Sequence, residues 1–539
     1  MKITKVVKHF LLRTKIYNFY LLKNNICDLS FTPKDAWPGD PVIGDQLVQG
    51  HYHLANEKIY SPENTLWHIS NSNKFWLKEV HSFSWLRHLK ARSGPLARKH
   101  AKYLILDWLN QYRNWNLQSW ELEILSRRVS AWITNFDFLL AEKDKNFSET
   151  LLENLFKQIK HLRSQASISY FQSLKKDMGL ELSSVKKIKI LRGLFLSCIC
   201  FDNENESFNK YSKILEQELE KSFNNEGMHS SKSPSSQLTI LGDLVTIREA
   251  MLSKQLNIPD FLELNINRSS HALRFFRKPN GSFAAFNGSK KETKFLIDKI
   301  LNLADGRARG KGPLNLSQSG FDKIVCHGTN IFVDTSCNNE KMLSKVPHAI
   351  EINIGKTKLL GSCGTIFEKN KDWKNSLLSA SAHSVLVIEN TDPQNSILEN
   401  NPATYKRYQK NGSEVMYLSH NGYKNKFSAI CSRIIEVNKT GENIAVLDQI
   451  YSEKLLNFKI RMHLSPKLKV SLSLDKKTAI ILFSDQGWKF KFQGNVKLAL
   501  EPSIFVADDG IVKKTSQLIL SGETINEKTE VLWGFAKGL

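Results

Sequence analysis

The sequence lacks the features that mark several common classes of protein. Its 539 residues contain no run of 18 or more apolar residues, which argues against a membrane-spanning helix. The seven cysteines form no CxxC pair, which argues against a zinc ribbon and against a disulfide framework. Neither GxGxxG nor GxxxxGKS/T occurs, and no helix-turn-helix, RNA-recognition or zinc-finger pattern is present. Nucleotide and nucleic-acid binding are therefore poorly supported.

Acidic residues are also scarce relative to basic ones. Lys and Arg number 76 against 53 Asp and Glu, which gives a formal net charge of +23. This excess predicts a polyanionic partner, such as an acidic polysaccharide, an anionic membrane surface or nucleic acid. The alternative is that the excess lysines are exposed and only keep the surface solvated, which gives the same net charge. Hydrophobic residues at 41% and charged residues at 24% are typical of a globular protein.

The first 25 residues, MKITKVVKHFLLRTKIYNFYLLKNN, are basic and partly apolar. Lys and Arg interrupt the apolar runs every few residues, and no small-residue cleavage site follows. This pattern does not support a signal peptide and favours an amphipathic first helix.

The first 270 or so residues have helical periodicity. The clearest segment is Phe83–Leu140, where apolar residues recur at steps of three and four. Further helices are predicted over Glu149–Asp177, Ser183–Cys200, Glu204–Phe223 and Ser236–Leu256. Consecutive helices with short polar joints predict stacked helical hairpins, in a solenoid or a toroid.

From about Asn315 the hydrophobic period changes to two. Strand-like segments follow one another without intervening helices, separated by turn signals such as Asn438–Gly441 and Asp475–Lys477. These segments are KIVCHGTNIFVDTS, HAIEINIGKTKLLGSCG, HSVLVIENT, FSAICSRIIEVNKTGENIAVLDQIY, KLKVSLSLDKKTAIILFS, WKFKFQGNVKLALEPSIFVA and QLILSG. This pattern predicts an antiparallel β-sandwich. The Gly- and Arg-rich segment Asp305–Pro313 is the best candidate for a linker between the two halves.

Several local motifs occur in an order that resembles the heparinase II/III-like family of polysaccharide lyases. They include DAWPGDPVIGDQLVQGHYHLANE, FSWLRHLKA, DWLNQYRNW, SRRVSAWI, NNEGMHSSKSP and FRKPNGSFAAFNG in the first half. SQSGFDKI, SASAHSVLVIENTDP, SHNGY, RMHLSPKLKV and VLWGF follow in the second. The resemblance implies an α+β multidomain fold. Residues 1–310 would form an α/α toroid (an incomplete helical barrel), and residues 311–539 an antiparallel β-sandwich.

Such lyases cleave a uronate-containing glycan by β-elimination, in a cleft where the toroid meets the sandwich. The uronate carboxylate must be neutralised, a base must remove the C5 proton, and an acid must protonate the leaving oxygen. His229 matches a glycine–histidine motif of the family and is a catalytic candidate; a purely structural His before a helix is the alternative. The tyrosine that follows in active lyases is replaced at Ser235 and Ser236, and the Asn-His pair is absent around Val185–Lys187.

Two more histidines, His348 and His383, match positions that place the base or bind a structural zinc in several lyases. Here Cys363 stands near the position of an intervening Asp, so His348, Cys363 and His383 are the predicted ligands if zinc is bound. The alternative is a pair of histidines that orients a loop. No cofactor is required for the reaction itself.

His420 and Tyr423 in HNGY resemble a His-Asp-Gly-Tyr turn of the family. Tyr423 is the preferred substitute acid, and a turn aromatic packed on the sheet is the alternative. His420, Lys186, Arg433 and Arg461 are predicted to bind the substrate carboxylate or sulfate, although paired strand arginines are more often surface charge. Two alternatives remain for five tryptophans: they stack on sugar rings, or they belong to the core. These residues are Trp37, Trp85, Trp115, Trp120 and Trp132.

The sequence thus predicts a polysaccharide lyase-like protein that cleaves an acidic glycan. A catalytically silent glycan-binding or envelope-assembly protein on the same scaffold is the alternative, because the expected Asn-His and Tyr residues are missing. The expected partner is an acidic polysaccharide, without nucleic acid and without a transmembrane segment, and a homodimer is left open. The family suggests the periplasm or cell envelope, whereas the N-terminus leaves the cytoplasm open.

Overall fold

A computed structural model describes residues 10–22, 28–55, 57–62, 66–69, 73–142, 144–166, 184–201, 205–290, 292–307, 309–336, 346–365, 371–393, 404–484, 486–506, 511–525 and 527–538. The chain divides into two compact units. Unit 1 comprises residues 1–222, 239–267 and 299–308, and unit 2 comprises residues 223–238, 268–298 and 309–539. Each is described below by itself.

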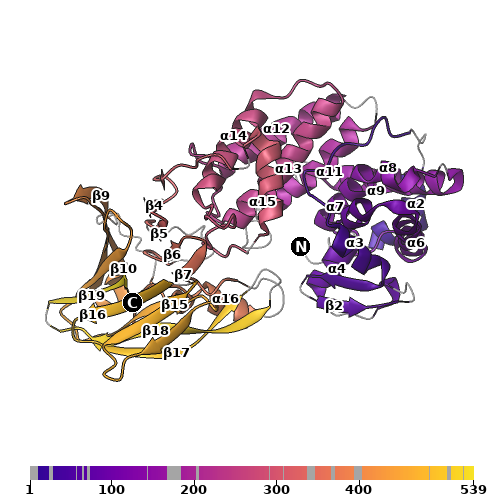
Figure 1. Ribbon diagram of the computed structural model, residues 1–539. Coiled ribbons are helices and arrows are strands. Elements are labelled where there is room, and N and C mark those ends of the chain that lie inside the picture. Colours follow the sequence, from indigo (N-terminus) through magenta and orange to yellow (C-terminus); the bar gives the residue numbers. More distant parts are fainter. Residues whose placement is uncertain are drawn as a thin grey trace. The chain divides into compact units, whose positions relative to one another are not determined.

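Unit 1 is helical (Figure 1). Its first helices are α2 (Lys15–Leu22), α3 (Pro41–Val48), α4 (Lys74–His81), α5 (Leu86–Arg92), α6 (Gly94–Tyr112), α7 (Leu122–Thr134), α8 (Phe136–Leu140) and α9 (Lys145–Gln165). α11 (Ser184–Ile199) and α12 (Asn205–Ser222) follow, and a small hairpin is formed by β1 (His51–Leu54) and β2 (Glu57–Tyr60). α13 (Pro234–Ser253), α14 (Asp260–Phe275) and α15 (Lys294–Asp305) are divided between the two units.

These helices confirm the helical periodicity of the first half, and within Phe83–Leu140 the chain forms α5 to α8. The predicted helix over Glu149–Asp177 corresponds to α9 up to Gln165, and its end lies outside the described residues. No helix in the described ranges is both long and apolar enough to cross a bilayer. The five cysteines within those ranges are free thiols; Cys27 and Cys337 lie outside them.

The WPGDP segment is fixed to the helices by two local features. The Asp40 side chain accepts a hydrogen bond from the Val42 backbone N–H and so caps α3, with Pro41 as its first residue. A side chain at Gly39 would collide with the backbone carbonyl of Arg87 in α5. Glycine therefore lets this segment lie directly against α5.

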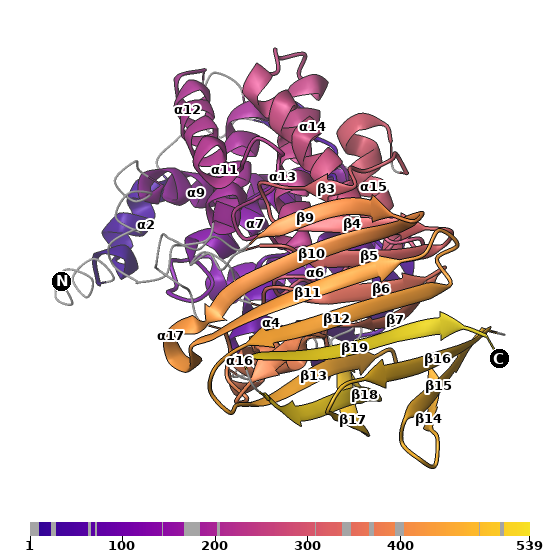
Figure 2. The same cartoon turned by 90° about the vertical axis from the view of Figure 1, so that its left-hand side faces the viewer.

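Unit 2 contains two antiparallel sheets that share one hydrophobic core. The eight-stranded sheet has the order β14 (Lys469–Leu472), β15 (Thr478–Phe483), β16 (Gln486–Gln493), β19 (Lys528–Lys537), β12 (Asn443–Tyr451), β11 (Ala429–Val437), β10 (Ser413–Tyr423) and β9 (Tyr405–Lys410). Figure 2 shows its strands side by side, with β9 at one edge.

The second sheet has nine strands. Its order is β17 (Lys497–Val506), β18 (Val512–Glu523), β13 (Asn457–Leu464), β7 (Thr357–Gly361), β6 (Ile350–Ile354), β5 (Thr329–Asp334), β4 (Phe321–Cys326) and β3 (Asn315–Leu316), and β8 (Leu386–Ile388) pairs with β13. The short helices α16 (Lys371–Leu378) and α17 (Lys424–Phe427) complete the unit. The alternation of buried and exposed residues along β12 shows how period-two patterning builds this sandwich.

One local prediction is wrong. SHNGY does not form a turn, because residues 419–423 are the end of strand β10. Met416, Leu418 and His420 continue one inward-facing row, so the strand persists through the Asn and Gly that suggested a turn. The pairing register with β11 shifts between His420 and Tyr423, as at a β-bulge.

Candidate functional site

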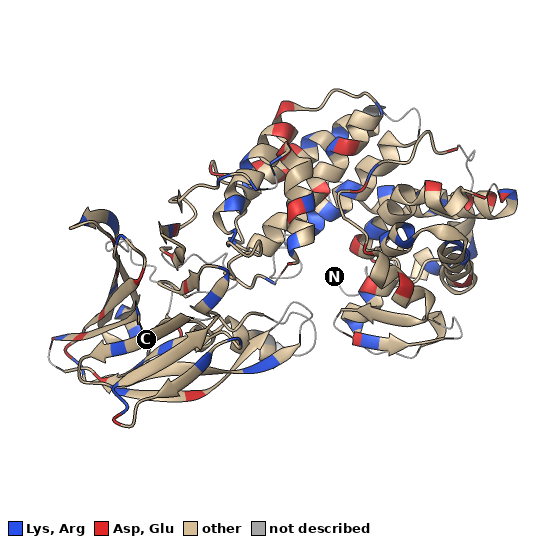
Figure 3. Ribbon diagram, in the orientation of Figure 1, with Lys and Arg blue, Asp and Glu red and all other residues tan. Residues whose placement is uncertain are grey.

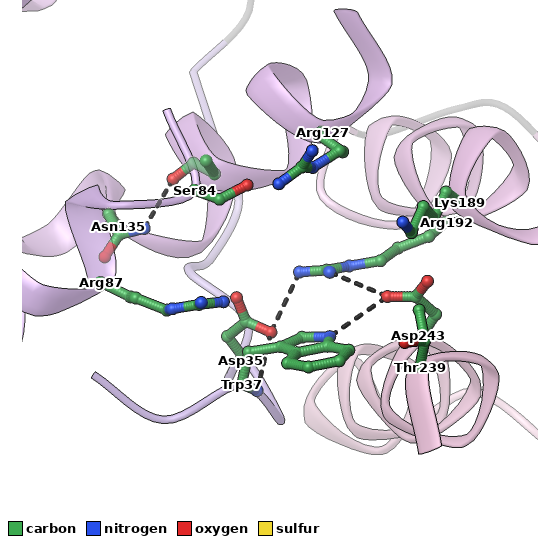
Figure 4. A pocket seen from close by; sticks show the side chains of 11 residues that line it. Asp35, Trp37, Ser84, Arg87, Arg127, Asn135, Lys189, Arg192, Thr239 and Asp243 are labelled. Atoms are coloured by element: carbon green, nitrogen blue, oxygen red, sulfur yellow. Dashed lines mark hydrogen bonds and ion pairs between the residues drawn. The ribbon is translucent and has the colours of Figure 1, made fainter. Parts of the chain in front are cut away.

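A pocket in unit 1 is lined by several charged side chains. Its volume is about 190 Å³. The lining residues come from the WPGDP segment, the start of α5, α7 and its C-terminus, α11 and α13 (Figure 4): Asp35, Trp37, Ser84, Arg87, Arg127, Ala131, Asn135, Lys189, Arg192, Thr239 and Asp243. Four cations face two carboxylates in this lining, so the pocket wall carries an excess of positive charge.

Three of the four cations are held by carboxylates. Arg192 donates from Nη1 to Asp243 Oδ1 and from Nη2 to Asp35 Oδ1, each at 3.0 Å. Burial opposes the charge of Arg192, but the two aspartates outweigh it and raise its pKa. Arg127 forms a bidentate pair with Glu79 at 2.6 and 2.7 Å, and Lys189 lies 3.6 Å from Glu123.

Arg87 differs from its neighbours. Its guanidinium makes no hydrogen bond or ion pair with any residue in the described ranges, and its Nε is buried without a partner. It lies over the Trp37 ring, 5.8 Å from the ring centre. Burial lowers the pKa of Arg87, and the nearby Asp35 charge partly offsets this. Arg87 is therefore the cation of the pocket whose guanidinium N–H groups have no acceptor among the described residues.

The Trp37 ring is fixed by a hydrogen bond and by close packing. Its Nε1 donates to Asp243 Oδ1 at 3.2 Å, and a side chain at Gly242 would lie 2.9 Å from its ring. Among the five tryptophans considered above, Trp85, Trp115, Trp120 and Trp132 are buried in the core, whereas Trp37 is partly exposed and lines the pocket.

The predicted catalytic residues lie in unit 2. His229 is 2% exposed and precedes α13, and its Nδ1 lies 2.8 Å from Ser231 Oγ. Its backbone N–H donates to Gln237 Oε1, and burial lowers the pKa of its imidazole to about 4. These contacts fit the structural alternative for His229.

Tyr423, His348 and His420 form one buried group in the sandwich. The rings of His348 and His420 are in edge contact, with centres 4.5 Å apart. Tyr423 belongs to the hydrophobic core and donates its hydroxyl hydrogen to the Thr391 carbonyl at 3.1 Å. Burial raises the pKa of Tyr423 and lowers the pKa of His420 to about 3. All three side chains are enclosed by the fold.

His383 and Cys363 lie elsewhere in unit 2. Both are buried, and burial lowers the pKa of His383 to about 4. Cys363 Sγ lies 3.3 Å from Nδ1 of His463, a residue that the zinc prediction did not include. In the described ranges no group of three or more His, Cys, Asp or Glu side chains is placed to hold a metal ion. The predicted trio of His348, Cys363 and His383 therefore does not form a metal site there.

The predicted substrate-binding cations have internal partners. Arg433 is 1% exposed and forms a bidentate pair with Asp448 at 2.6 and 2.9 Å. Arg461 donates to Gln517 Oε1 at 3.4 Å. Lys186 lies in unit 1 on α11, 3.4 Å from Glu123, and does not line the pocket.

Comparison with known proteins defines the family. Residues 308–534 match the family model described as heparinase II/III-like, C-terminal. A crystal structure of heparinase III aligns with 97% of this chain and 88% of that chain, with a TM-score of 0.71 at 14% identity. The second half of the chain is a heparinase II/III-like C-terminal domain. Heparan sulfate lyase HepC from Pedobacter heparinus aligns with a TM-score of 0.60 at 14% identity, over 97% of this chain and 87% of that chain. At these identities the structural likeness shows the fold.

The chain is also similar in sequence to a protein with a different name. FtsZ-localized protein C of Caulobacter vibrioides (strain NA1000 / CB15N) is 25% identical over 545 residues, which cover 94% of this chain and 90% of that protein. The likeness therefore extends through both halves.

The residues of the pocket were mostly missed from the sequence, yet a signal for them was present. Three segments that carry the family resemblance supply its wall: DAWPGDP supplies Asp35 and Trp37, FSWLRHLKA supplies Ser84 and Arg87, and SRRVSAWI supplies Arg127 and Ala131. What the sequence could not show is that these segments meet around one cavity.

Tyr423→Phe tests the catalytic assignment of this residue. The change removes one hydrogen bond to the Thr391 carbonyl and keeps the ring, so we expect a loss of about 1 kcal/mol in the free energy of unfolding. Glycan binding should be unchanged within error. Urea unfolding and calorimetric titration measure the two effects. Loss of glycan binding or turnover in a folded Tyr423→Phe protein would restore Tyr423 as a functional residue.

Proposed function

We propose that this protein binds a uronate-containing acidic glycan in the unit 1 pocket and does not cleave it. The observation that carries the proposal is the unpartnered Arg87 guanidinium in a cavity that also contains the Trp37 ring. A guanidinium binds a carboxylate or sulfate in bidentate geometry, and an indole ring packs on the apolar face of a sugar. The pocket thus combines an anion receptor with a sugar platform.

The positive charge of the chain suits this partner but does not locate the site. Lys and Arg occur on helices of unit 1 and on strands of unit 2 alike (Figure 3). The pocket adds specificity, because Arg127 and Arg192 are held rigidly by carboxylates while Arg87 remains available. Preorganised groups of this kind reduce the entropic cost of binding.

The proposal that the glycan is not cleaved is supported by the environment of the candidate catalytic residues. A general base or acid must reach the proton that it transfers, whereas His229, His348, His383 and Tyr423 are buried. The pocket lining contains no His or Tyr among the described residues. The fold match to heparinase III over 97% of the chain favours β-elimination as the second candidate.

Further parts of the proposal concern architecture and location. We propose that the helices of the first half form an incomplete α/α toroid, and that the protein acts at the cell envelope as a glycan-binding or envelope-assembly factor. The Caulobacter relative is named for its localisation with FtsZ, which is in keeping with an assembly role. A homodimer remains compatible with this function.

Arg87→Ala is the variant that tests the proposal. Loss of a charge-assisted hydrogen-bonded contact, about 1.5–3 kcal/mol, should weaken binding roughly tenfold to a hundredfold. Calorimetric titration of the full chain with heparin, heparan sulfate, chondroitin, hyaluronan, alginate and bacterial exopolysaccharides measures this, with neutral dextran as the glycan control.

Arg92→Ala is the matched control. Arg92 lies on the same helix, pairs with Asp45 at the surface and does not line the pocket, so its removal should leave affinity within twofold or so. Equal affinities of wild type, Arg87→Ala and Arg92→Ala for the glycan would place binding elsewhere. An absence of binding to the whole panel would refute the proposal.

A further inference from the structure

Helix α2 presents an apolar face to solvent. Ile16, Phe19 and Tyr20 are 81%, 69% and 54% exposed, and their spacing of three and four residues places them on one side of the helix. Phe10, Leu11 and Leu22, in the same described range, are also exposed. Large apolar side chains scattered singly over a surface are ordinary, but a contiguous group of this kind indicates a contact surface.

The opposite face of α2 is attached to unit 1. Leu21 is buried, and the hydroxyl of Tyr17 lies 2.7 Å from His161 Nδ1 on α9. Lys160 Nζ, also on α9, donates to the Tyr20 carbonyl at 2.7 Å. α2 lies beside α9 at the margin of the helical half in both views (Figures 1 and 2). The Tyr20 ring lies beneath the same Lys160 Nζ, which is 4.1 Å from the ring centre. These contacts fix the rotation of the helix and leave Ile16 and Phe19 exposed.

The charge of this part of the sequence is of one sign. Residues 1–27 contain six cationic residues, Lys2, Lys5, Lys8, Arg13, Lys15 and Lys23, and the first acidic residue is Asp28. Arg13 and Lys15 are exposed. Exposed apolar side chains on α2, with the exposed Arg13 and Lys15 next to them in sequence, are typical of helices that lie in the interface of a membrane.

We propose that α2 docks this protein on an anionic lipid surface. In this arrangement Ile16 and Phe19 enter the boundary between headgroups and acyl chains, and the flanking basic residues meet anionic headgroups. A second copy of the chain fits less well, because two such segments repel each other electrostatically. Nucleic acid would neutralise the charge but leave the apolar side chains exposed to water.

The size of the contact surface determines the kind of binding. Two or three inserted side chains and a few cations give reversible attachment that weakens at high salt, in contrast to a spanning helix. Glycan binding by Arg87 is independent of this surface, because Arg87 belongs to the pocket.

Vesicle flotation of the full chain tests the proposal. We expect the protein to float with vesicles of phosphatidylcholine and phosphatidylglycerol, to remain behind with pure phosphatidylcholine, and to be released at high salt. The double variant Ile16→Glu with Phe19→Glu should lower the vesicle affinity at least about tenfold, because two apolar side chains no longer enter the lipid. Both positions are exposed, so circular dichroism should show an unchanged fold.

Leu455→Glu is the control, because Leu455 is 74% exposed and belongs to unit 2, whereas α2 belongs to unit 1; it should float like the wild type. Unchanged flotation of the double variant would overturn the proposal, as would equal binding to neutral vesicles or no binding at all. Light scattering without lipid provides another test. An oligomer that forms in the wild type but not in the double variant would assign the surface to a second copy instead.

Discussion

Mild acid is expected to destabilise both units between about pH 6 and pH 4. Five buried histidines of unit 2 have a pKa below its usual value of about 6.5, and burial is the main cause for each: His229, His348, His383, His420 and His463. In the unfolded chain these imidazoles take up protons as the pH falls through 6.5. In the folded chain they stay neutral to well below that pH. The unfolded state therefore binds more protons, and acid favours it.

Two aspartates act in the opposite direction. Burial raises the pKa of Asp322 and of Asp334 to about 6, so the folded state gains protons at these carboxyls between about pH 6 and 4. Five histidines against two aspartates leave a net of three protons. At about 1.4 kcal/mol per proton and pH unit, the stability of unit 2 should fall by roughly 4 kcal/mol per pH unit. A typical domain stability of about 5–15 kcal/mol is exhausted within a few pH units at that rate.

Three histidines of unit 1 act in the same way. Burial lowers the pKa of His81 and of His88 to about 3, and the lowered pKa of His100 has the same main cause. Their three protons match the net of three in unit 2, so the uptake of protons on unfolding is similar in the two units. Hydrogen exchange followed by mass spectrometry over a pH series measures both. Strands of unit 2 and helices α6 and α7 should lose protection between about pH 6 and pH 4, and protected strands at pH 4 would contradict this.

Arg433→Met should be among the most destabilising substitutions in the sandwich. The guanidinium pairs with Asp448 through two hydrogen bonds and also donates to the His348 carbonyl at 2.8 Å. Asp448 in turn accepts a hydrogen bond from Trp533 Nε1. Removal of Arg433 leaves a carboxylate buried without its counter-charge, which costs about 3–5 kcal/mol.

Two further variants make this result specific. Arg433→Met combined with Asp448→Leu removes both charges and should recover much of the loss, because apolar replacements of a buried pair are often neutral. Arg461→Met, on strand β13, should cost about 1 kcal/mol or less, since its guanidinium has a single long contact with Gln517. Urea unfolding measures all three. A small effect of Arg433→Met, with reduced glycan affinity, would support the substrate role that the sequence suggested.

The fold was predictable where one residue pattern dominates. Apolar spacing of three and four identified α11, α12 and α13, and alternation identified β11, β12 and β15. β9, β10, β13 and β19 were not separated as strands, because polar or glycine residues such as those of SHNGY interrupt their alternation. These strands form through pairing with neighbours distant in sequence, which local pattern does not encode.

The candidate site was predictable only in part. His229, His348 and His383 were chosen because they match motifs of the family, but a motif match does not reveal whether a side chain is buried. Arg87, Arg127 and Asp243 come from three helices, and only the packing of those helices around the Trp37 segment brings them together. The family motifs indicated the right segments, whereas the chemistry of the cavity required the structure.

The central claim is that this chain binds an acidic glycan without cleaving it. The most direct measurement is the ultraviolet absorbance of the unsaturated uronate product, recorded for the full chain on a glycan that calorimetry shows to bind. The account predicts a flat trace for the wild type, with binding that Arg87→Ala weakens and Arg92→Ala preserves. A steady rise in absorbance, lost in a folded His229→Ala or Tyr423→Phe protein, would contradict it and establish a lyase.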